Sequence, residues 1–276
     1  MHLHNSKQRR FRNPYSPSSI QEKGCRSVSV AQQPVDFFEE TGEQECILTR
    51  GSYSVRLADP QNLGGEISTL IKRMYSWRGY QTESLGASSH NPNQLTLEAT
   101  VGGHLVGTLT LGIDSEEGLL ADELYGKEID VFRRKGRKVC ELTKLAIDSE
   151  YSSKEILASL FHLAYIHGHS INGATDLFIE VNPRHAGFYR RMLGLSQVGQ
   201  ERICQRVCAP AVLMHLELNY VGAQIASYAG SCKSGEKSLY PYFFSKHEVM
   251  GLAKQLQRHK INQHGVSSTE NRVSSN

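Results

Sequence analysis

The sequence lacks any long hydrophobic run. No stretch of its 276 residues approaches the roughly 18 apolar residues that a membrane span requires. Residues 1–19 lack the apolar core of a secretory leader. Hydrophobic residues make up 39% of the chain, and its mean hydropathy is −0.41. We therefore expect a soluble globular protein that does not insert into a membrane, with the cytoplasm as its default location.

Cysteine and histidine show no metal-binding spacing. The six cysteines are scattered, and Cys204 and Cys208 have no second pair at zinc-finger spacing. The twelve histidines include no H-E-x-x-H pattern, and His162, His167 and His169 do not fall on one helix face. We expect buried thiols in a reducing compartment and no metal site.

The net charge of +3 comes from the two ends of the chain. Residues 1–30 hold six Lys or Arg and one acid, and residues 253–276 hold four and one. Between them lie 21 basic and 26 acidic residues, so this central part is net negative. This argues against a nucleic-acid partner that would contact a broad basic face.

Composition divides the chain into one domain with two tails. Residues 1–45 are rich in Ser, Pro and Gln without a sustained period, and residues 259–276 are polar, so both are predicted to be disordered. Residues 46–258 form the predicted domain, which ends in a helix over 240–258. No internal repeat is present.

Hydrophobic periodicity predicts alternating strands and helices in this domain. Strands are expected over 53–58, on both sides of Gly102-Gly103, over 138–147 and over 175–181, and as two strands in 201–218 that break near Pro210. Helices are expected over 62–80, 119–134, after 152 and after 182. Two glycines favour a type I′ hairpin, whereas strand–helix–strand units run parallel. The fold class is α/β (α+β mixed sheet), a mixed sheet with helices on both faces.

Two charged residues stand inside the apolar strand "VCELTKLAI". A buried carboxylate or ammonium needs a partner. Strict alternation puts Glu141 on one face with Val139 and Ile147, and Lys144 on the other, so the two cannot pair within the strand. Either Glu141 pairs with an arginine such as Arg56 or Arg78, or it faces a functional cleft.

The turn after this strand carries a helix-start signal. Ser152-Ser153-Lys154-Glu155 has the S-x-x-E spacing of a capping box, which places a helix N-terminus at the end of the strand. Free N–H groups at that place are suited to a phosphate, and an ordinary capped helix is the alternative.

The segment "IEVNPRHAGFYRRMLGL" (179–195) resembles the motif N-x-x-A-x-x-x-Y-x-x-x-G-F of the GNAT superfamily of N-acyltransferases. Counted from Asn182, Tyr189 takes the place of the family tyrosine; counted back from Gly194, Arg190 does. The resemblance implies that Tyr189 is the acid that protonates the leaving thiolate. It also implies a GNAT-like acyl-N-acyltransferase fold.

The superfamily's glycine-rich coenzyme A loop has no counterpart in this chain, because its place holds "DSEYSSKE". A turn without glycine is poorly shaped to wrap a pyrophosphate but can hold a single phosphate. A donor with one phosphate is 4′-phosphopantetheine on an acyl carrier protein. Coenzyme A is the alternative donor, and no further cofactor is expected.

The strand "ELTKLAID" resembles the E-x-S-R strand of the acyl-homoserine-lactone synthases, with Glu141, Thr143 and Lys144 at the three positions. "VGTLTLG" resembles their G-x-x-R-L strand, with Thr110 in place of Arg. From residue 53 to 244 the chain is most similar to the bacterial N-acyl amino acid synthases. The segments behind this likeness are "SVRLA", "RGY", "ELTKLAID", "EVNPRHAGFY", "RICQRVCAPAVL" and "SLYPYFFS".

This resemblance implies an N-acyltransferase that moves a long fatty acyl group from acyl carrier protein to the α-amine of an amino acid such as tyrosine. Glu141 would take the amine proton through water. The acyl-pantetheine site would comprise Leu145, Ala146, Ile147, Ser152, Ser153, Lys154 and Asn182. The rival functions are an acetyl-coenzyme A acetyltransferase, a signal-lactone synthase, and a non-catalytic module that binds acyl groups or carrier protein.

Two further segments suit such an enzyme. "MYSWRGY" (74–80) supplies Trp77, Arg78 and Tyr80 for the acceptor site, where the Arg78 guanidinium matches a carboxylate; alternatively, it is a helix end packed by aromatics. "RRKGRK" (133–138) supplies a basic patch beside the expected pantetheine site, which would dock an acidic carrier protein, or is a solvated turn. Its cations are Arg133, Arg134, Lys135, Arg137 and Lys138.

Overall fold

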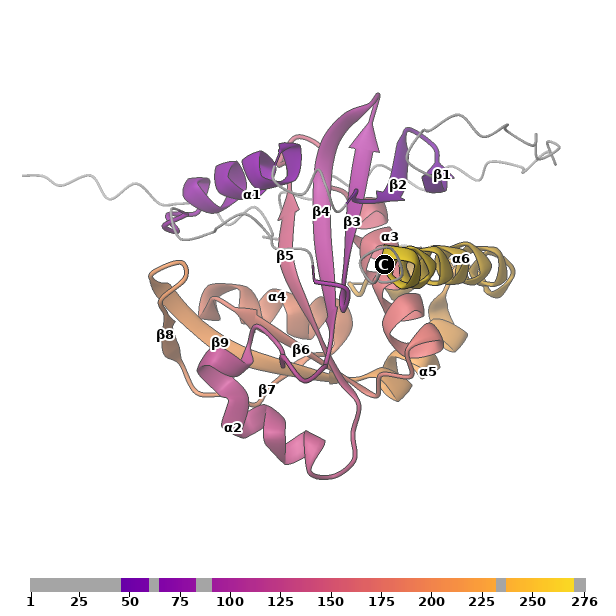
Figure 1. The fold of residues 1–276 in the computed structure, drawn as a ribbon. Coiled ribbons are helices and arrows are strands. Elements are labelled where there is room, and N and C mark those ends of the chain that lie inside the picture. The colour runs from indigo at the N-terminus through magenta and orange to yellow at the C-terminus, as the bar shows by residue number, and fades with distance from the viewer. Residues whose placement is uncertain (1–45, 60–64, 83–90, 232–236, 271–276) are drawn as a thin grey trace, which may run out of the picture.

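The computed structural model describes residues 46–59, 65–82, 91–231 and 237–270 (Figure 1). The predicted N-terminal tail, residues 1–45, lies outside these ranges. Within them, nine strands form one sheet in the order β1-β2-β3-β4-β5-β6-β9-β7, and β8 pairs with β9. The strands are β1 (Cys46–Arg50), β2 (Tyr53–Leu57), β3 (Gln94–Val101), β4 (His104–Ile113), β5 (Val139–Ile147), β6 (Asp176–Val181), β7 (Ser196–Gln197), β8 (Arg202–Cys204) and β9 (Ala209–Glu217).

The pairing confirms the predicted mixed sheet. β5 and β6 run parallel, while the described neighbours on either side of them pair antiparallel. The hairpin between β3 and β4 turns at Gly102 and Gly103, whose φ angles of 57° and 82° both lie in the left-handed region. Glycine reaches this region without steric cost, as the type I′ turn requires.

Helices cover both faces of the sheet (Figure 1). The helical segments are α1 (Glu66–Trp77), α2 (Asp122–Arg133), α3 (Lys154–Tyr165), the π-helical turn η1 (Ile166–Ile171), α4 (Pro183–Leu193), α5 (Leu218–Tyr228), the 3₁₀ turn η2 (Tyr240–Tyr242) and α6 (Lys246–Glu270). α2 packs on Val139 and Phe178, and α1 packs on Ala146. α3 packs on the opposite face of β5, against Cys140 and Leu142.

The structure contains four elements that the sequence did not predict, and it moves two predicted boundaries. β1, β7, α5 and η1 were not predicted. The predicted helix end at residue 258 is wrong, because α6 continues to Glu270. Leu252 and Leu256 are buried and hold the start of α6 on the core, and each further residue then adds one backbone hydrogen bond. The strand break lies between Cys204 and Ala209, so that Pro210 is inside β9.

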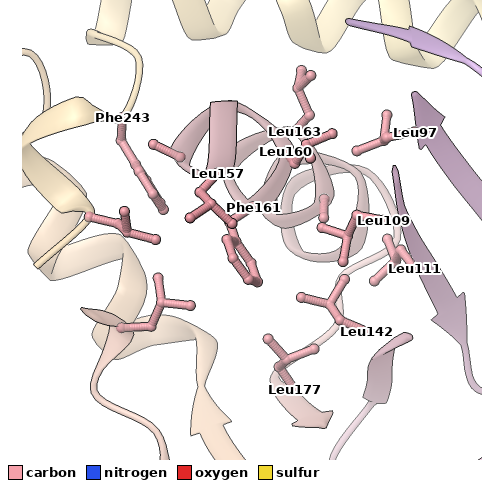
Figure 2. Close-up of a cluster of buried hydrophobic side chains, with 14 of the residues drawn as sticks. Leu97, Leu109, Leu111, Leu142, Leu157, Leu160, Phe161, Leu163, Leu177 and Phe243 are labelled. Atoms are coloured by element: carbon pink, nitrogen blue, oxygen red, sulfur yellow. The ribbon is translucent and has the colours of Figure 1, made fainter. Parts of the chain in front are cut away.

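The main core lies between the sheet and α3. Figure 2 shows Leu97, Leu109 and Leu111 from β3 and β4 facing Leu157, Leu160, Phe161 and Leu163 from α3. These side chains are at most 5% exposed. Burying a leucine or phenylalanine side chain contributes about 1.5–3 kcal/mol, so this layer fixes α3 on β4 and β5.

A β-bulge in β5 overturns the predicted alternation of faces. Lys144 has a φ of 54°, and the register jumps from Thr110↔Thr143 to Thr108↔Ala146, so two residues of β5 oppose one of β4. A bulge shifts the phase of the strand by one residue. Ile147 therefore packs into the α3 core and Ala146 packs against α1, not the faces that strict alternation assigned to them.

β5 and β6 separate soon after they begin. Their ladder has three pairs, Val139↔Asp176, Cys140↔Leu177 and Glu141↔Phe178. β6 continues along β9 to Val181, whereas β5 continues along β4. Figure 1 shows the two strands diverging toward different parts of the molecule.

Candidate active site

A cavity of about 360 Å³ opens where β5 and β6 diverge. Leu142–Leu145 of β5, including the bulge, form one wall, and Ile179–Val181 of β6 together with Asn182 form the facing wall. α1, α4 and the hairpin between β8 and β9 complete the enclosure. Small-ligand sites are commonly clefts of this size with an apolar lining and a few placed polar groups.

The cavity has an apolar part and a polar part. Leu109, Leu142, Phe161 and Ile179 supply its apolar surface. Polar side chains enter from the other elements, and Thr110 in β4 shares a 2.8 Å hydrogen bond with Thr96 in β3. Thr110 holds the position where the lactone synthases are expected to carry arginine, and here it contributes an uncharged, paired hydroxyl.

α4 presents Tyr189 to the cavity. Tyr189 lines the cavity and packs on the main core, whereas the neighbouring Arg190 is exposed and is not part of the lining. Asn182 begins α4 by accepting the Arg184 N–H at 3.2 Å, and its amide donates to the Pro210 carbonyl at 3.0 Å. Of the two candidates for the family tyrosine position, Tyr189 is therefore the one that faces the cavity.

Glu141 does not face the cavity as predicted. It is 2% exposed, and its two oxygens accept the backbone N–H groups of Leu120 at 2.7 Å and Ala121 at 3.0 Å. Burial raises the pKa of Glu141 to about 7, and the two N–H donors oppose this rise. The carboxylate thus holds the loop before α2, because β5 presents its Val139 and Glu141 face to α2 rather than to the cleft.

The predicted arginine partners of Glu141 are engaged elsewhere. Arg56 forms an ion pair with Glu98 at 2.7 Å, and Arg78 donates to the Met74 carbonyl at 2.8 Å. Cross-strand neighbours explain the first pair, because Arg56 and Glu98 face each other in the β2–β3 ladder.

Lys144 lines the cavity beside the bulge. Burial lowers the pKa of its ammonium, and the nearby Glu141 carboxylate opposes the decrease. A left-handed φ is uncommon for a residue with a long side chain, and such strain clusters at functional sites. The bulge thus brings a cation to the wall of the cavity.

The predicted acceptor residues divide into two groups. Arg78 and Tyr80 line the cavity, and Arg184 connects them, since its guanidinium lies 5.1 Å from the Tyr80 ring and donates to the Arg78 carbonyl at 2.8 Å. Trp77 is 51% exposed and is not part of the lining. Trp77 falls outside because the C-terminal turn of α1 presents it to solvent.

Only some of the residues predicted to bind the donor line the cavity. Leu145 and Asn182 line the cavity, whereas Ala146 and Ile147 are buried on opposite faces of β5. The N-cap of α3 is Ser153 rather than Ser152, because the Ser153 hydroxyl accepts the Ile156 N–H at 3.2 Å.

The turn before α3 lies near two cations. The Ser152 hydroxyl is buried and has no hydrogen-bond partner among the described residues. The Lys154 ammonium lies 5.3 Å from the Tyr242 ring, and Arg50 donates to the Tyr242 carbonyl at 3.4 Å. The N-terminus of α3 therefore combines an unsatisfied hydroxyl with two nearby positive charges.

The basic turn 133–138 does not lie beside this donor turn. It precedes β5, and the Ser152–Lys154 turn follows β5, so the two are at opposite ends of the strand. Two of its cations also form ion pairs with acidic residues of the same protein. Arg133 binds Asp114, Asp122 and Asp130, and Arg137 binds Asp176 and Glu217, while Arg134, Lys135 and Lys138 are exposed.

Several cavity residues were not assigned from the sequence. Arg206 of the β8–β9 hairpin binds Glu180 at 2.8 Å and also contacts Glu123, and Cys204 lies beside this pair. His185 lines the cavity, and burial, together with Arg184 and Arg78, lowers its pKa to about 4. The hairpin segment "RICQRVCAPAVL" carried the family likeness, but neither motif nor spacing assigned a role to Arg206.

The described ranges contain neither a metal-binding cluster nor a membrane-spanning helix. Within them no group of three His, Cys, Asp or Glu residues is arranged to hold a metal ion. No helix there is both long and apolar enough to span a bilayer. The prediction that the cysteines are buried is wrong for Cys46 and Cys208, which are exposed; Cys140 and Cys204 are buried. Cys25 and Cys232 lie outside the described residues.

Comparisons with known proteins agree with this architecture. The family model for the N-acyl amino acid synthase FeeM matches residues 66–217. The solved structure of FeeM, an N-acyl amino acid synthase from uncultured soil microbes, has 27% sequence identity and a TM-score of 0.55, over 60% of this chain and 90% of that chain. No curated protein matches the chain.

Two more distant structures are also similar. The acyl-homoserine-lactone synthase LasI has 16% identity and a TM-score of 0.43, over 61% of this chain and 92% of its own. A GNAT-family acetyltransferase from Streptococcus pneumoniae has 16% identity and a TM-score of 0.41, over 60% and 98%. The predicted fold, an open mixed sheet with helices, is confirmed by the sheet order and by the likeness to the FeeM structure.

Proposed function

The chain belongs to the N-acyl amino acid synthase FeeM family of acyltransferases, and we propose that it acylates the α-amine of an amino acid such as tyrosine. The proposed donor is a long fatty acyl group on the phosphopantetheine of an acyl carrier protein. The observation that carries this proposal is the cavity of about 360 Å³ between β5 and β6, which joins an apolar part to a polar part with several cations.

The donor side of the proposed site is the turn before α3. The phosphate of phosphopantetheine would lie at the α3 N-terminus, near the Ser152 hydroxyl, with Lys154 and Arg50 close by. No glycine occurs between Asp148 and Glu155, which disfavours a wrapped pyrophosphate and hence coenzyme A. Acyl carrier proteins are acidic, so the same two cations would assist their docking.

The acceptor side is the wall formed by α1 and the β8–β9 hairpin. Arg78 and Arg206 line it, Lys144 of β5 lines the same cavity, and a guanidinium fork suits the carboxylate of an amino acid. Tyr80 supplies an aromatic surface for an acceptor such as tyrosine. The approach of the α-amine to the thioester would then occur at the bulge, between the two sides.

Two proton transfers accompany the reaction. The attacking amine must be neutral, and Glu180, an acid in the cavity wall, is our candidate to accept its proton directly or through water. Collapse of the tetrahedral intermediate breaks the carbon–sulfur bond, and the Tyr189 hydroxyl would protonate the leaving thiolate. Glu141 serves as a positioning residue, because it holds Leu120 in the cavity wall.

The donor and acceptor are tested together. Purified protein is incubated with palmitoyl-carrier protein or palmitoyl-coenzyme A and a panel of amino acids, and the amide products are measured by mass spectrometry. We expect a higher kcat/KM with the carrier and the largest yield with an aromatic acceptor. Equal kcat/KM for the two donors would overturn the carrier assignment, and the absence of any amide would make the chain a binding module. The proposal also places the protein in the cytoplasm, where acyl carrier protein is found.

A further inference from the structure

A second, smaller cavity lies behind the apolar part of the active-site cavity. Its volume is about 30 Å³, and its lining comes from α3, η1, the beginnings of β5 and β6, and their neighbours β4, β9, α4 and α5. Its lining is almost entirely hydrocarbon, with Leu111, Leu177, Leu216 and Phe243 among its members. A small cavity of this lining stays dry and accepts apolar groups in preference to water.

Leu142 and Phe161 belong to both cavities. Figure 2 shows these two side chains beside Leu177, with Leu142 reaching from β5 and Phe161 from α3. The two side chains therefore form a partition: the active-site cavity lies on one side of them and the small cavity on the other. Both side chains are hydrocarbon, and a rotamer change of either one would open a path between the two spaces.

The far wall of the small cavity has a gap that a glycine leaves open. Gly168 lies in the π-helical turn η1 and lines the small cavity. A Cβ built on Gly168 would lie 3.6 Å from both terminal carbons of Leu111 and 3.8 Å from the Cys140 sulfur. Since both neighbours also line the cavity, an added methyl would occupy cavity space at ordinary contact distance. Single π-helical turns within helices occur often at functional sites.

We propose that the end of the donor's acyl chain passes between Leu142 and Phe161 into the small cavity, and that Gly168 sets the length of chain accepted. This inference rests on the proposed function and identifies the residues that select among acyl groups. A carboxylate or thioester is excluded from so apolar a space, so the chain enters by its methyl end. Each methylene that leaves water for such a space strengthens binding by about fourfold.

Three variants test this passage. Leu142→Ala removes most of the partition and enlarges the space, whereas Gly168→Ala shortens it. Leu163→Ala is the matched control, because Leu163 is a fully buried leucine of α3 that lines neither cavity. It reports the general effect of a truncated core leucine on the enzyme.

Binding and turnover are measured on each variant and the wild type. Isothermal titration with decanoic, dodecanoic, tetradecanoic and hexadecanoic acids gives affinity against chain length without requiring catalysis. Acyl-carrier proteins with the same four chains give the profile of kcat/KM. We expect the preferred chain to lengthen by at least two carbons in Leu142→Ala, to shorten by about two in Gly168→Ala, and to stay unchanged in Leu163→Ala.

The two readouts separate the passage from the proposed reaction. Unchanged profiles in both Leu142→Ala and Gly168→Ala would overturn the passage, and so would a shift of equal size in Leu163→Ala. If fatty acids bind with the expected length dependence but no amide forms, the proposed reaction is wrong and the passage holds. If Leu142→Ala fails to fold, the Gly168→Ala profile decides alone.

Discussion

The Glu141 carboxylate and the Leu120 backbone N–H are joined by a hydrogen bond of 2.7 Å that connects β5 to the loop before α2. Leu120 lines the cavity, so this bond positions a wall of the site from within the protein interior. Gly112, directly opposite in β4, leaves room for the side chain: a Cβ there would lie 3.2 Å from the Glu141 Cγ. A charged residue in an apolar strand is thus explained by two backbone donors.

Glu141→Gln should reduce stability. Glutamine retains one acceptor oxygen but places an NH₂ group against a second backbone N–H, so that one buried donor loses its partner. This costs about 1–3 kcal/mol of unfolding free energy, measured by urea denaturation. If Glu141 were instead a catalytic base, the variant would lose turnover at an unchanged melting temperature.

Glu141 should also make stability depend on pH. Its pKa rises from 4.5 to about 7 on folding because burial disfavours the charged form. The folded protein therefore holds this proton more tightly than the unfolded chain, so the contribution is largest below pH 4.5 and is lost as the pH rises toward 7. Between pH 5 and 7.5, the wild type should lose more unfolding free energy than Glu141→Gln. If the curves of unfolding free energy against pH were parallel for the two proteins, the raised pKa of Glu141 would be contradicted.

Arg133 should stabilise the fold, whereas Lys135 in the same turn should not. Its guanidinium binds Asp114 at 2.7 Å and Asp130 at 2.9 Å, and also Asp122, so Arg133→Ala leaves three carboxylates facing one another. We expect a loss of about 2 kcal/mol, reduced at high salt. Lys135→Ala, at an exposed residue, is the control and should change stability by less than about 0.5 kcal/mol. Equal losses of unfolding free energy in the two variants would show that the ion pairs of Arg133 do not stabilise the fold.

Tyr189→Phe should slow acyl transfer while leaving the fold intact. The ring of Tyr189 packs on the core and its hydroxyl is the proposed acid, so phenylalanine preserves the packing and removes the proton. General acid catalysis contributes about 10²–10⁴-fold, and we expect kcat to fall within that range at constant melting temperature.

Arg190→Ala is the matched control for Tyr189→Phe. Arg190 follows Tyr189 in α4 but is exposed, and it was the alternative candidate for the same role. Its kcat should stay within about twofold of the wild type. If kcat fell strongly in Arg190→Ala but stayed normal in Tyr189→Phe, Arg190 rather than Tyr189 would hold the family tyrosine position.

Sequence patterns predicted most of the elements that carry the site. The period of 3.6 residues located α1 and α3, and Gly102-Gly103 located the turn between β3 and β4. The segment from Asn182 to Gly194 placed Tyr189 in a helix that begins where β6 ends. These successes depend on local signals, namely turn glycines, the spacing of the family motif and amphipathic periodicity.

The errors arose where distant segments decide the structure. Strict alternation along β5 failed because a bulge opposite Leu109 inserts one residue, and no local signal marks Lys144 as left-handed. The partner of Glu141 was missed because a backbone N–H carries no sequence signature. The basic turn was placed beside the donor site by proximity in sequence, although β5 separates the two.

The short ladder between β5 and β6 has a mechanical consequence. In the described sheet, the strands from β1 to β5 pair with those from β6 onward through only three residue pairs. Arg137 bridges Asp176 and Glu217 beside the first of these pairs, so the fixed end is braced by charge while the diverging end is held apart by side chains. An acyl donor between β5 and β6 would therefore contact both half-sheets at the place where their backbone pairing has ended, and its binding would add contacts between them that the short ladder does not supply.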